Sequence, residues 1–260
     1  MADSGTINPE PMVSPMLARI DHNRVFDDLD SLANTAAIDC LRLANDMITE
    51  RGRFHIALSG GRTPQRLYEQ LADRIKETDW SRWHICFGDE RCVPPDHPRS
   101  NAGMARKAWL SRVPIPSSQV HIMFNAGNDP ENAAAAYAAH LQSLPRTADG
   151  CWPIFDLALM GLGSDGHVAS LFPHSDALRE DRRPVVAVPP PEGEEWRITL
   201  TYPVFNHARN LWFLVAGSDK REVMARIQRG ENLSTPLPIQ RLTPQAQPRW
   251  YLDRTAVIPS

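Results

Sequence analysis

The amino-acid sequence predicts an α/β fold, in which a doubly wound, mostly parallel sheet is flanked by helices. Short apolar runs, typical of strands buried on both faces, alternate along the chain with longer segments whose apolar residues recur at helical spacing. Several of these runs end in turns that carry glycines and charged side chains, as strands do at the ligand-binding edge of an open α/β sheet. The same pattern is compatible with a small inserted subdomain.

Length and composition are those of a soluble globular protein. The 260 residues are enough to bury a sizeable core, and we expect a disordered N-terminal lead over residues 1–20 followed by a single α/β domain over residues 21–260. Hydrophobic residues make up 42% of the chain and charged residues 23%. The formal net charge of −3 argues against a nucleic-acid partner, but a local pocket can still be positive enough to bind an anionic small molecule.

The sequence also predicts the cellular compartment of the protein. No apolar run approaches the ~20 residues that a membrane helix needs, so we expect no membrane partner. The N-terminus lacks the apolar core of a signal peptide. The four cysteines, Cys40, Cys86, Cys92 and Cys151, form no C-x-x-C pair and no Cys/His spacing typical of zinc. These features predict a cytoplasmic protein with reduced thiols and no metal site.

Taken in order, the chain alternates predicted strands with predicted helices. Strands are expected at residues 24–26, 54–58, 83–87, 155–160, 185–188, 196–201, 211–216 and 250–253, the last of them at an edge of the sheet. Helices are expected at residues 29–48, 65–75, 100–108, 131–144, 168–172 and 217–227. Arg51 and Gly52 are typical of a helix end, and Thr63 is placed to cap the second helix with Pro64 at its first position.

The stretch from Phe155 to Pro173 carries the strongest functional signal. An apolar run, interrupted only by Asp156, is followed by three glycines within six residues, which permit a sharp turn and present backbone amides to a ligand. That turn contains Asp165 and His167. A purely structural interpretation would have Asp165 form the turn and His167 cap a helix. Two matching signals elsewhere in the chain favour a ligand site instead.

The first matching signal follows the strand at residues 54–58. Gly60 and Gly61 form a turn before a helix that is expected to start at Thr63. Free amides at such a start, together with the helix dipole, attract a phosphate. The turn is neither a P-loop nor a dinucleotide-binding fingerprint. A tight connection without a ligand is the structural alternative.

The second matching signal is a set of charged residues just past other strands. Asp89 and Arg91 follow the strand at residues 83–87, where an internal salt bridge is the structural alternative. Lys220 begins a helix, where a cation is electrostatically unfavourable, so an anionic partner would explain it. Arg197 lies opposite the apolar face of its own strand and is a weaker candidate.

These blocks resemble, in the same order along the chain, the 6-phosphogluconolactonase family. The matching segments are residues 59–64, 88–91, 100–106, 161–173 and 217–220, and the resemblance spans residues 26–253. Glucosamine-6-phosphate deaminases share the fold but typically have Asp-Glu-Tyr where this chain has Asp89-Glu90-Arg91. They also continue after the histidine to Asn-Glu-Pro, whereas this chain continues through Ala169 to Pro173. The resemblance implies a Rossmann-like fold of the sugar-phosphate isomerase/deaminase type.

The resemblance also implies an activity: hydrolysis of 6-phospho-D-glucono-1,5-lactone to 6-phospho-D-gluconate in the oxidative pentose phosphate pathway, without a cofactor. His167 is the one group of suitable basicity in the central turn to activate water, and Asp165 would set its tautomer. The phosphate is expected to bind Gly60, Gly61, Thr63, Arg91 and Lys220, with Arg197 as a weaker candidate. Asp89 and Asn101 would bind sugar hydroxyls or hold Arg91.

Three alternatives stay open from the sequence. An acyl-enzyme on Ser164 or Ser170, which flank the histidine, is disfavoured because the chain has no G-x-S-x-G elbow. A deaminase or isomerase acting on an amino-sugar phosphate would use the same fold. A non-catalytic sugar-phosphate sensor would be expected to carry a DNA-binding or partner domain, and no such appendage is visible. The substrate is the only partner that we expect besides a second copy, so the protein would act as a monomer or homodimer.

Overall fold

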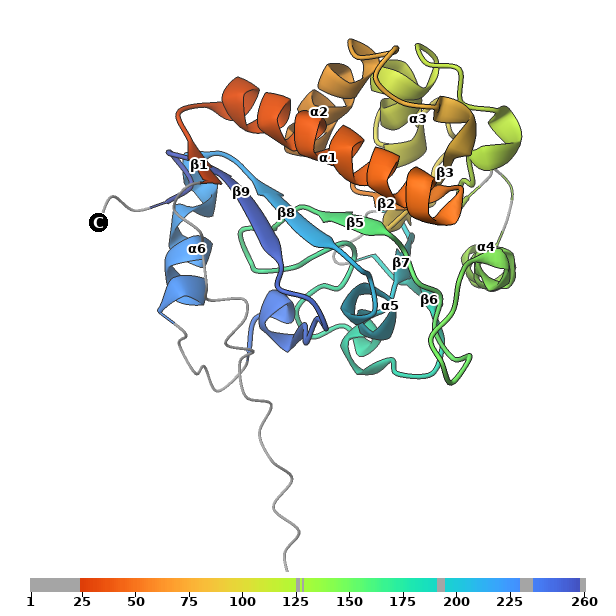
Figure 1. The fold of residues 1–260 in the computed structure, drawn as a ribbon. Helices are drawn as coiled ribbons and strands as arrows, with labels where there is room; N and C mark the ends of the chain where they lie inside the picture. The colour runs from red at the N-terminus through yellow and green to blue at the C-terminus, as the bar shows by residue number, and fades with distance from the viewer. Residues whose placement is uncertain (1–23, 125–126, 128, 191–194, 230–235, 258–260) are drawn as a thin grey trace, which may run out of the picture.

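Six parallel strands form the main sheet of this protein (Figure 1). The computed structural model describes residues 24–124, 127, 129–190, 195–229 and 236–257. The strand order is β1-β9-β8-β5-β2-β3, and every neighbouring pair is parallel. The strands are Val25–Phe26 (β1), Phe54–Leu58 (β2), Trp83–Phe87 (β3), Leu157–Met160 (β5), Leu211–Val215 (β8) and Arg249–Asp253 (β9).

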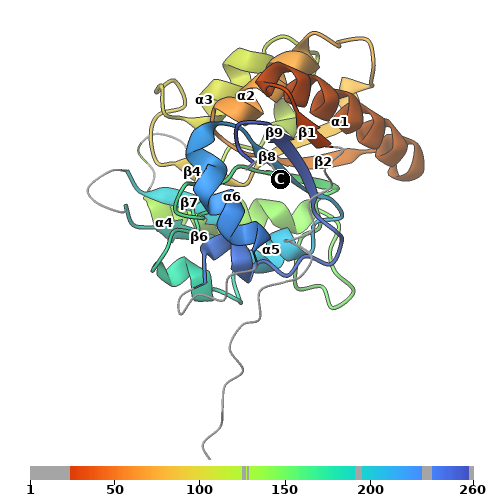
Figure 2. The same ribbon diagram turned by 90° about the vertical axis from the view of Figure 1, so that its left-hand side faces the viewer.

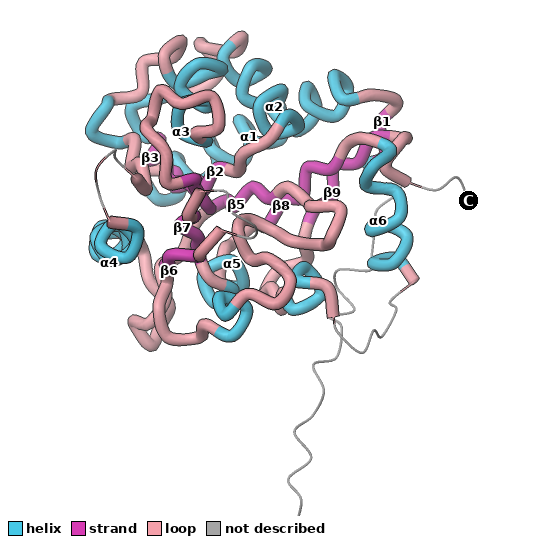
Figure 3. The backbone as a smooth tube through the Cα atoms, turned by 180° about the vertical axis from the view of Figure 1, so that it is seen from behind, coloured by secondary structure: helices cyan, strands magenta, loops and turns pink. Residues whose placement is uncertain are grey.

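Helices cover both faces of this sheet, which confirms the predicted doubly wound class. Figure 1 shows α1, α2 and α3 above the sheet and α5 and α6 below it, and Figure 3 shows the same layers from behind. The helices are Leu29–Arg51 (α1), Arg62–Ala72 (α2), Asn101–Ala105 (α3), Pro130–His140 (α4), Tyr202–Asn206 (α5) and Arg221–Gln228 (α6). Short 3-10 turns lie at Trp80–Arg82, Ser117–Gln119, Leu141–Ser143, Asp176–Arg179, Ser218–Lys220 (η7) and Pro238–Arg241, and a π turn at Arg106–Leu110.

A second, smaller sheet is antiparallel and has the order β4-β7-β6. Its strands are Asp89–Arg91 (β4), Val185–Val188 (β6) and Arg197–Leu200 (β7), and Figure 2 shows them next to α4. Because β4 and the β6–β7 pair come from distant parts of the chain, this sheet is not one continuous insertion. Only Gly88 separates β3 from β4, so β4 carries its charged residues away from the main sheet.

Helix α2 begins earlier than the sequence predicted, so the expected cap at Thr63 is wrong. Gly61 is the N-cap, and its carbonyl accepts a hydrogen bond from the Gln65 amide at 3.0 Å. Thr63 therefore lies inside the first turn. No side chain caps this helix, and its first amides remain available to a ligand.

The helix predicted at residues 168–172 is also wrong, since this segment is a tight turn. Val168 and Leu171 form an antiparallel bridge and are both buried. Ala169 between them has a φ of 49°, in the left-handed region that a right-handed helix excludes. A segment of five residues next to a glycine turn, four of them apolar, is too short to sustain a helix against this bridge.

The last strand is not at an edge, contrary to the prediction. β9 lies between β1 and β8, and β1 with only two residues is the edge strand. Val25 pairs with Leu252 at that edge. A strand's position in a sheet depends on partners that are distant in sequence, so a local pattern does not determine it.

A cluster of aromatic side chains stabilises the region beneath α2. Trp80, Trp83 and Trp109 are almost completely buried and contact one another at ring-centroid distances of 4.7–5.7 Å. Tyr68 stacks on Trp109, and its hydroxyl donates to the Ser59 carbonyl at 2.8 Å and accepts from the Ser59 amide at 3.0 Å. Helix α2 thereby holds the carboxyl end of β2 in place.

Three further expectations concern the N-terminal lead, membrane-spanning helices and the cysteines. The predicted disordered lead, residues 1–20, lies outside the described residues. Within the described ranges, no helix is both long enough and apolar enough to cross a membrane. All four cysteines are free thiols, as expected.

The order in which strands are added to the sheet reverses between β2 and β5. From β2 the chain moves to β3 on one side, while β5 is followed by β8 and β9 on the other side. In open α/β sheets this switch point leaves a crevice at the carboxyl ends of the strands. The glycine turns after β2 and β5 lie at this crevice.

Candidate active site

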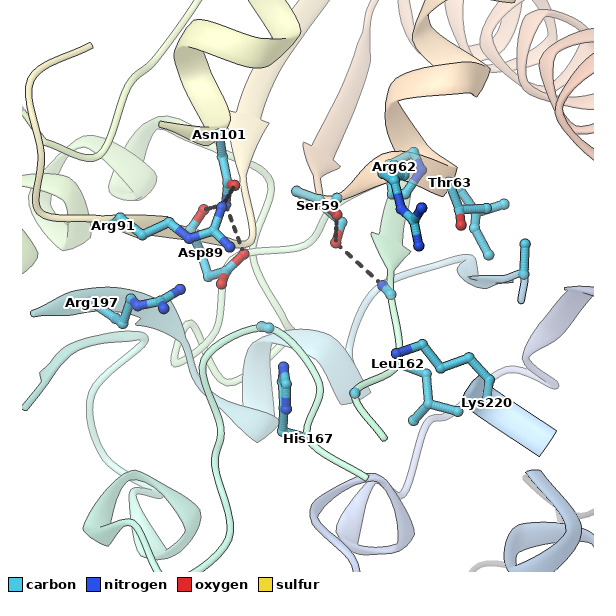
Figure 4. A pocket seen from close by; sticks show the side chains of 18 of the residues that line it. Ser59, Arg62, Thr63, Asp89, Arg91, Asn101, Leu162, His167, Arg197 and Lys220 are labelled. Carbon is cyan, nitrogen blue, oxygen red and sulfur yellow. Dashed lines mark hydrogen bonds between the residues drawn. The ribbon is translucent and has the colours of Figure 1, made fainter. Parts of the chain in front are cut away.

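The turns after β2 and β5 meet at one pocket. The Ser59 hydroxyl oxygen accepts a hydrogen bond from the Gly161 amide at 3.2 Å, which joins the two turns directly. The pocket has a volume of about 340 Å³ and also receives residues from β4, β7 and the segment after β8 (Figure 4). Two motifs that lie about 100 residues apart in the sequence thus line the same cavity.

The structure brings nine of the ten predicted site residues into this lining. They are Gly60, Gly61, Thr63, Asp89, Arg91, Asn101, His167, Arg197 and Lys220. The tenth, Asp165, does not line the pocket but contacts His167. The lining also includes Arg62, Ser59 and Phe172, which the sequence did not single out as site residues.

His167 and Asp165 form a hydrogen-bonded pair at the pocket. The imidazole Nδ1 lies 2.6 Å from the Asp165 Oδ1, which also accepts from the His167 amide at 3.1 Å. Partial burial raises the pKa of Asp165, but its hydrogen bonds with His167 and the charge of that ring more than offset this effect, so the pKa lies below its ordinary value. An ionised Asp165 holds the proton on Nδ1 and leaves Nε2 free to accept one. Figure 4 shows the His167 ring pointing into the pocket.

The imidazole is held in place by close neighbours. A Cβ atom on Gly163 would collide with the ring, so only glycine fits there, and the Gly163 amide donates to the His167 carbonyl at 2.9 Å. The ring of Phe172 lies 4.8 Å from the imidazole, centroid to centroid. The Arg197 guanidinium in turn lies over the Phe172 ring, 5.7 Å from its centroid. These contacts restrict the directions in which Nε2 can point.

Asn101 connects three parts of the site. Its Nδ2 donates to the backbone carbonyl of Asp89 at 2.8 Å and to the Asp89 carboxylate at 3.2 Å. Its Oδ1 accepts from Arg91 Nη1 at 2.7 Å. A side chain on Gly60 would occupy the place of the Asn101 amide, so the glycine of the first turn is required by this contact. Asn101 therefore sets the position of Asp89 and Arg91 relative to the β2 turn.

Glu90 holds this arrangement from behind. It is 2% exposed, and its two oxygens accept hydrogen bonds from the Arg91, Asn101 and Ala102 amides and from the Ser100 hydroxyl, at 2.7–3.1 Å. Burial raises the pKa of Glu90 more strongly than these bonds lower it. The sequence prediction noted Glu90 only as part of a charged cluster. Its donors are three backbone amides and one hydroxyl, so it organises the backbone, and among the described residues no ion pair involves it.

Four cations line the pocket: Arg62, Arg91, Arg197 and Lys220. Figure 4 shows Arg62 and Lys220 on one side and Arg91 and Arg197 on the other. The Lys220 ammonium lies 3.0 Å from the Asp219 carboxylate. The hydrogen bond with Lys220, and to a lesser extent the charge of Arg62, lower the pKa of Asp219. Arg62 and Lys220 therefore both lie close enough to Asp219 to lower its pKa, on the same side of the pocket.

Arg62 is the functional candidate that the sequence prediction missed. It lies in the first turn of α2, where the positive end of the helix dipole disfavours a cation. The same argument was applied to Lys220 and would have identified Arg62. It was overlooked because the helix was expected to begin at Thr63, which placed Arg62 outside it.

Neither serine next to the histidine is placed to act as a nucleophile. Ser170 is completely buried, and its hydroxyl donates to the Asp89 carboxylate at 2.7 Å. Ser164 is exposed and does not line the pocket. This geometry argues against the acyl-enzyme alternative and gives Ser170 the role of holding Asp89. Among the described residues, no group of three or more His, Cys, Asp or Glu side chains could hold a metal ion.

Fold and site together define an α/β protein with a histidine–aspartate pair and four cations at one pocket, a combination suited to an anionic small molecule. Residues 27–251 match the family model described as glucosamine-6-phosphate isomerases/6-phosphogluconolactonase. The chain belongs to this family.

Individual relatives agree with the family match. A 6-phosphogluconolactonase from Nostoc sp. is 43% identical over 209 residues, which is 80% of this chain and 85% of that protein. Among solved structures, a protein named devB is 32% identical with a TM-score of 0.80, covering 90% of this chain and 96% of the other. A 6-phosphogluconolactonase from Trypanosoma cruzi is 30% identical with a TM-score of 0.77, covering 89% and 94%.

The Glu90 contacts predict a positioning role that can be measured. In Glu90→Gln the side chain keeps its shape, but its NH2 group replaces one acceptor and faces two buried donors. An unsatisfied buried donor costs about 1–3 kcal/mol, so the free energy of unfolding in urea should fall by at least that amount. The displaced Asn101 and Arg91 should also raise KM for the substrate. The matched variant Glu131→Gln, on the exposed start of α4, should leave both quantities unchanged. A normal KM in a destabilised Glu90→Gln would show that Glu90 supports only the fold.

Proposed function

We propose that this protein hydrolyses 6-phospho-D-glucono-1,5-lactone to 6-phospho-D-gluconate, a step of the oxidative pentose phosphate pathway. The observation that carries this proposal is the His167–Asp165 pair facing a pocket whose walls hold four cations. A lactone is an ester that water attacks readily, so its hydrolysis needs a base, a stabilised oxyanion and a grip on the phosphate. The pocket supplies groups for all three tasks.

His167 acts as the general base in the proposed mechanism. Its Nε2 takes a proton from a water molecule as the water oxygen forms a bond to the lactone carbonyl carbon. The carbonyl electrons move onto the oxygen, and a nearby cation or backbone amide stabilises this oxyanion. When the carbonyl reforms, the bond to the ring oxygen breaks and His167 returns its proton to that oxygen. Asp165 stabilises the imidazolium between the two steps.

The phosphate binds in the proposed complex at the N-terminus of α2. Gly60, Gly61 and Thr63 offer backbone amides and a hydroxyl there. Lys220 and Arg62 add positive charge from the same side of the pocket. A phosphate monoester carries about −1.5 to −2 charge at neutral pH, so amides alone would leave it under-compensated. Arg91 completes the phosphate site from the opposite side.

The remaining site residues would bind the sugar end of the substrate. Asp89 lines the pocket, and its carboxylate can accept hydrogen bonds from sugar hydroxyls. Arg197, whose guanidinium lies over the Phe172 ring, offers a positive charge for the phosphate or for the developing oxyanion. Because the chemistry needs only water and these groups, we propose that the enzyme is independent of a cofactor. We also propose that it is cytoplasmic and acts as a monomer or homodimer without a nucleic-acid partner.

A direct assay tests the reaction. The purified protein should release acid from freshly generated 6-phosphogluconolactone faster than buffer does, both with and without a chelator. The test also covers the deaminase and sensor alternatives. Ammonia release from glucosamine 6-phosphate with a lactone rate equal to the blank would favour the deaminase. Tight binding of either sugar phosphate with no turnover would favour the sensor.

The general-base role predicts a large effect of His167→Ala. General acid–base groups contribute about 10²–10⁴-fold, so kcat should fall by that factor while the urea midpoint stays close to that of the unmodified protein. Asp165→Asn should cause a smaller loss of kcat, because it weakens orientation without removing the base. Ser164→Ala should be nearly silent, because this exposed side chain lies outside the pocket. Loss of turnover in Ser164→Ala with retained activity in His167→Ala would refute the water mechanism.

The phosphate site predicts substrate-dependent effects of the cations. A hydrogen bond to a charged group is worth roughly 1.5–3 kcal/mol, so Lys220→Ala, Arg62→Ala or Arg91→Ala should each lower kcat/KM about 10- to 150-fold, mainly through KM. The control substrate is glucono-1,5-lactone, which has no phosphate, and on which the variants should match the unmodified protein. Equal losses on both substrates would assign the residue to the lactone or to the fold.

A further inference from the structure

A second pocket lies at the opposite, amino-terminal ends of β2 and β3. It has a volume of about 290 Å³ and is lined by Arg51, Gly52, Arg53, Ser81, Arg82, His84 and Gln119. Strands rise about 3.3 Å per residue, so the length of β2 places this pocket roughly 17 Å from the candidate active site. The two pockets share no lining residue. Three of the seven lining residues are arginines, and none is acidic.

The strand register brings positive groups side by side at this pocket. His55 of β2 pairs with His84 of β3. Arg53 lies just before β2, Arg82 is the last residue of the 3-10 turn just before β3, and both line the pocket. Two like charges that line one pocket repel each other. A bound anion between the two arginines would remove this repulsion.

The protein's own carboxylates neutralise this cluster only in part. Arg51 pairs with Glu50 at 2.9 Å, and Arg82 lies 3.7 Å from Asp79. In the ranges that the structure covers, Arg53 has no carboxylate within ion-pair distance. The negative end of the α1 dipole favours a cation at the end of that helix, but it does not account for Arg82, which lies just before β3. The pocket thus keeps a surplus of positive charge.

His84, in the pocket wall, is neutral at physiological pH. Burial, and to a lesser extent the charges of His55, Arg53 and His140, together lower its pKa to about 4. The His84 ring stacks on His121 at 6.0 Å, and His121 contacts His140 at 3.9 Å, centroid to centroid. Burial likewise lowers the pKa of His121 to about 4. An anion near His84 would oppose these effects and raise its pKa.

Gln119 adds an acceptor to a pocket that otherwise offers donors. Its Nε2 donates to the Ser81 carbonyl at 2.8 Å, which fixes the orientation of the amide. Its Oε1 is buried and has no hydrogen-bond partner among the described residues. A ligand that satisfies both the arginines and this oxygen must carry charged oxygens and a donor. A partly protonated phosphate group has both, whereas sulfate has acceptors only.

We propose that this pocket is a second anion site that binds the phosphate group of a small molecule. Arg53 and Arg82 bind its charged oxygens, and the Gln119 Oε1 accepts a hydrogen bond from its P–OH group. Inorganic phosphate and a small phosphate monoester share this chemistry. The site is separate from the catalytic pocket and does not depend on the proposed lactonase activity.

Proton NMR of the His84 ring tests this proposal with inorganic phosphate as the probe, at constant ionic strength held with sodium chloride. The His84→Gln variant assigns the signal. We expect a saturable shift in the millimolar range and a rise in the pKa of His84 by at least about 1. Sulfate should bind about fivefold or more weakly, because it cannot donate to Gln119. A parallel titration with 6-phosphogluconate identifies the source, since the tighter-binding probe shows whether free phosphate or a phosphate ester is preferred.

Matched variants separate a specific site from general charge effects. Arg53→Gln and Arg82→Gln should each weaken phosphate binding at least about tenfold while lactone hydrolysis stays within about twofold. Arg179→Gln, which removes an exposed arginine paired with Asp176, should change neither. The His84 response should persist in Lys220→Ala, in which the first site is impaired. A response that does not saturate, that survives in both Arg53→Gln and Arg82→Gln, or that disappears in Lys220→Ala would overturn the proposal. Urea midpoints verify folding, and either arginine variant suffices if the other does not fold.

Discussion

The hydrogen bonds of the Asn101 amide are the contact on which the site most depends. This side chain sits where Gly60 has no Cβ, and it binds Asp89 and Arg91 at the same time. Asn101 is itself positioned by Glu90, a buried carboxylate that accepts two hydrogen bonds from the start of α3. Burying a carboxylate is unfavourable unless its lone pairs are satisfied, so Glu90 stays stable only while this backbone arrangement persists. The geometry of three motifs therefore depends on one connected polar network.

The two sides of the pocket are built in different ways. Asp89, Asn101 and Arg91 are tied by side-chain hydrogen bonds and belong to the small sheet and the adjoining helix. The other side consists of the uncapped start of α2 with Arg62 and of Lys220, whose contacts are largely exposed. A preorganised wall suits the positioning of a reacting group, because reorganisation would add to the barrier. A helix start surrounded by cations suits an anchor that must capture and release a charged product.

The parallel sheet has a pocket at each end of its strands. In a parallel sheet all carboxyl ends of the strands lie on one side and all amino ends on the other. Residues that follow β2 and β5 therefore meet at one side, and residues that precede β2 and β3 meet at the opposite side. At the carboxyl ends, the pocket contains both cations and carboxylates together with the imidazole. At the amino ends, the pocket is lined by three arginines and the neutral His84, without an acidic lining residue. One register thus generates two pockets of different electrostatic character.

The sequence by itself determined the class of fold, most strand positions and nine lining residues of the pocket, because buried strands and glycine turns are local patterns. Residues 54–58 and 83–87, for example, form β2 and β3 with the predicted bounds. Tertiary structure alone decided the interior position of β9, the turn at Val168 to Leu171 and the pairing of β4 with β7. It also decided that Ser170 supports Asp89 and that Glu90 faces the backbone. These features depend on partners distant in sequence, and the free energy of such contacts appears only when the chain brings them together.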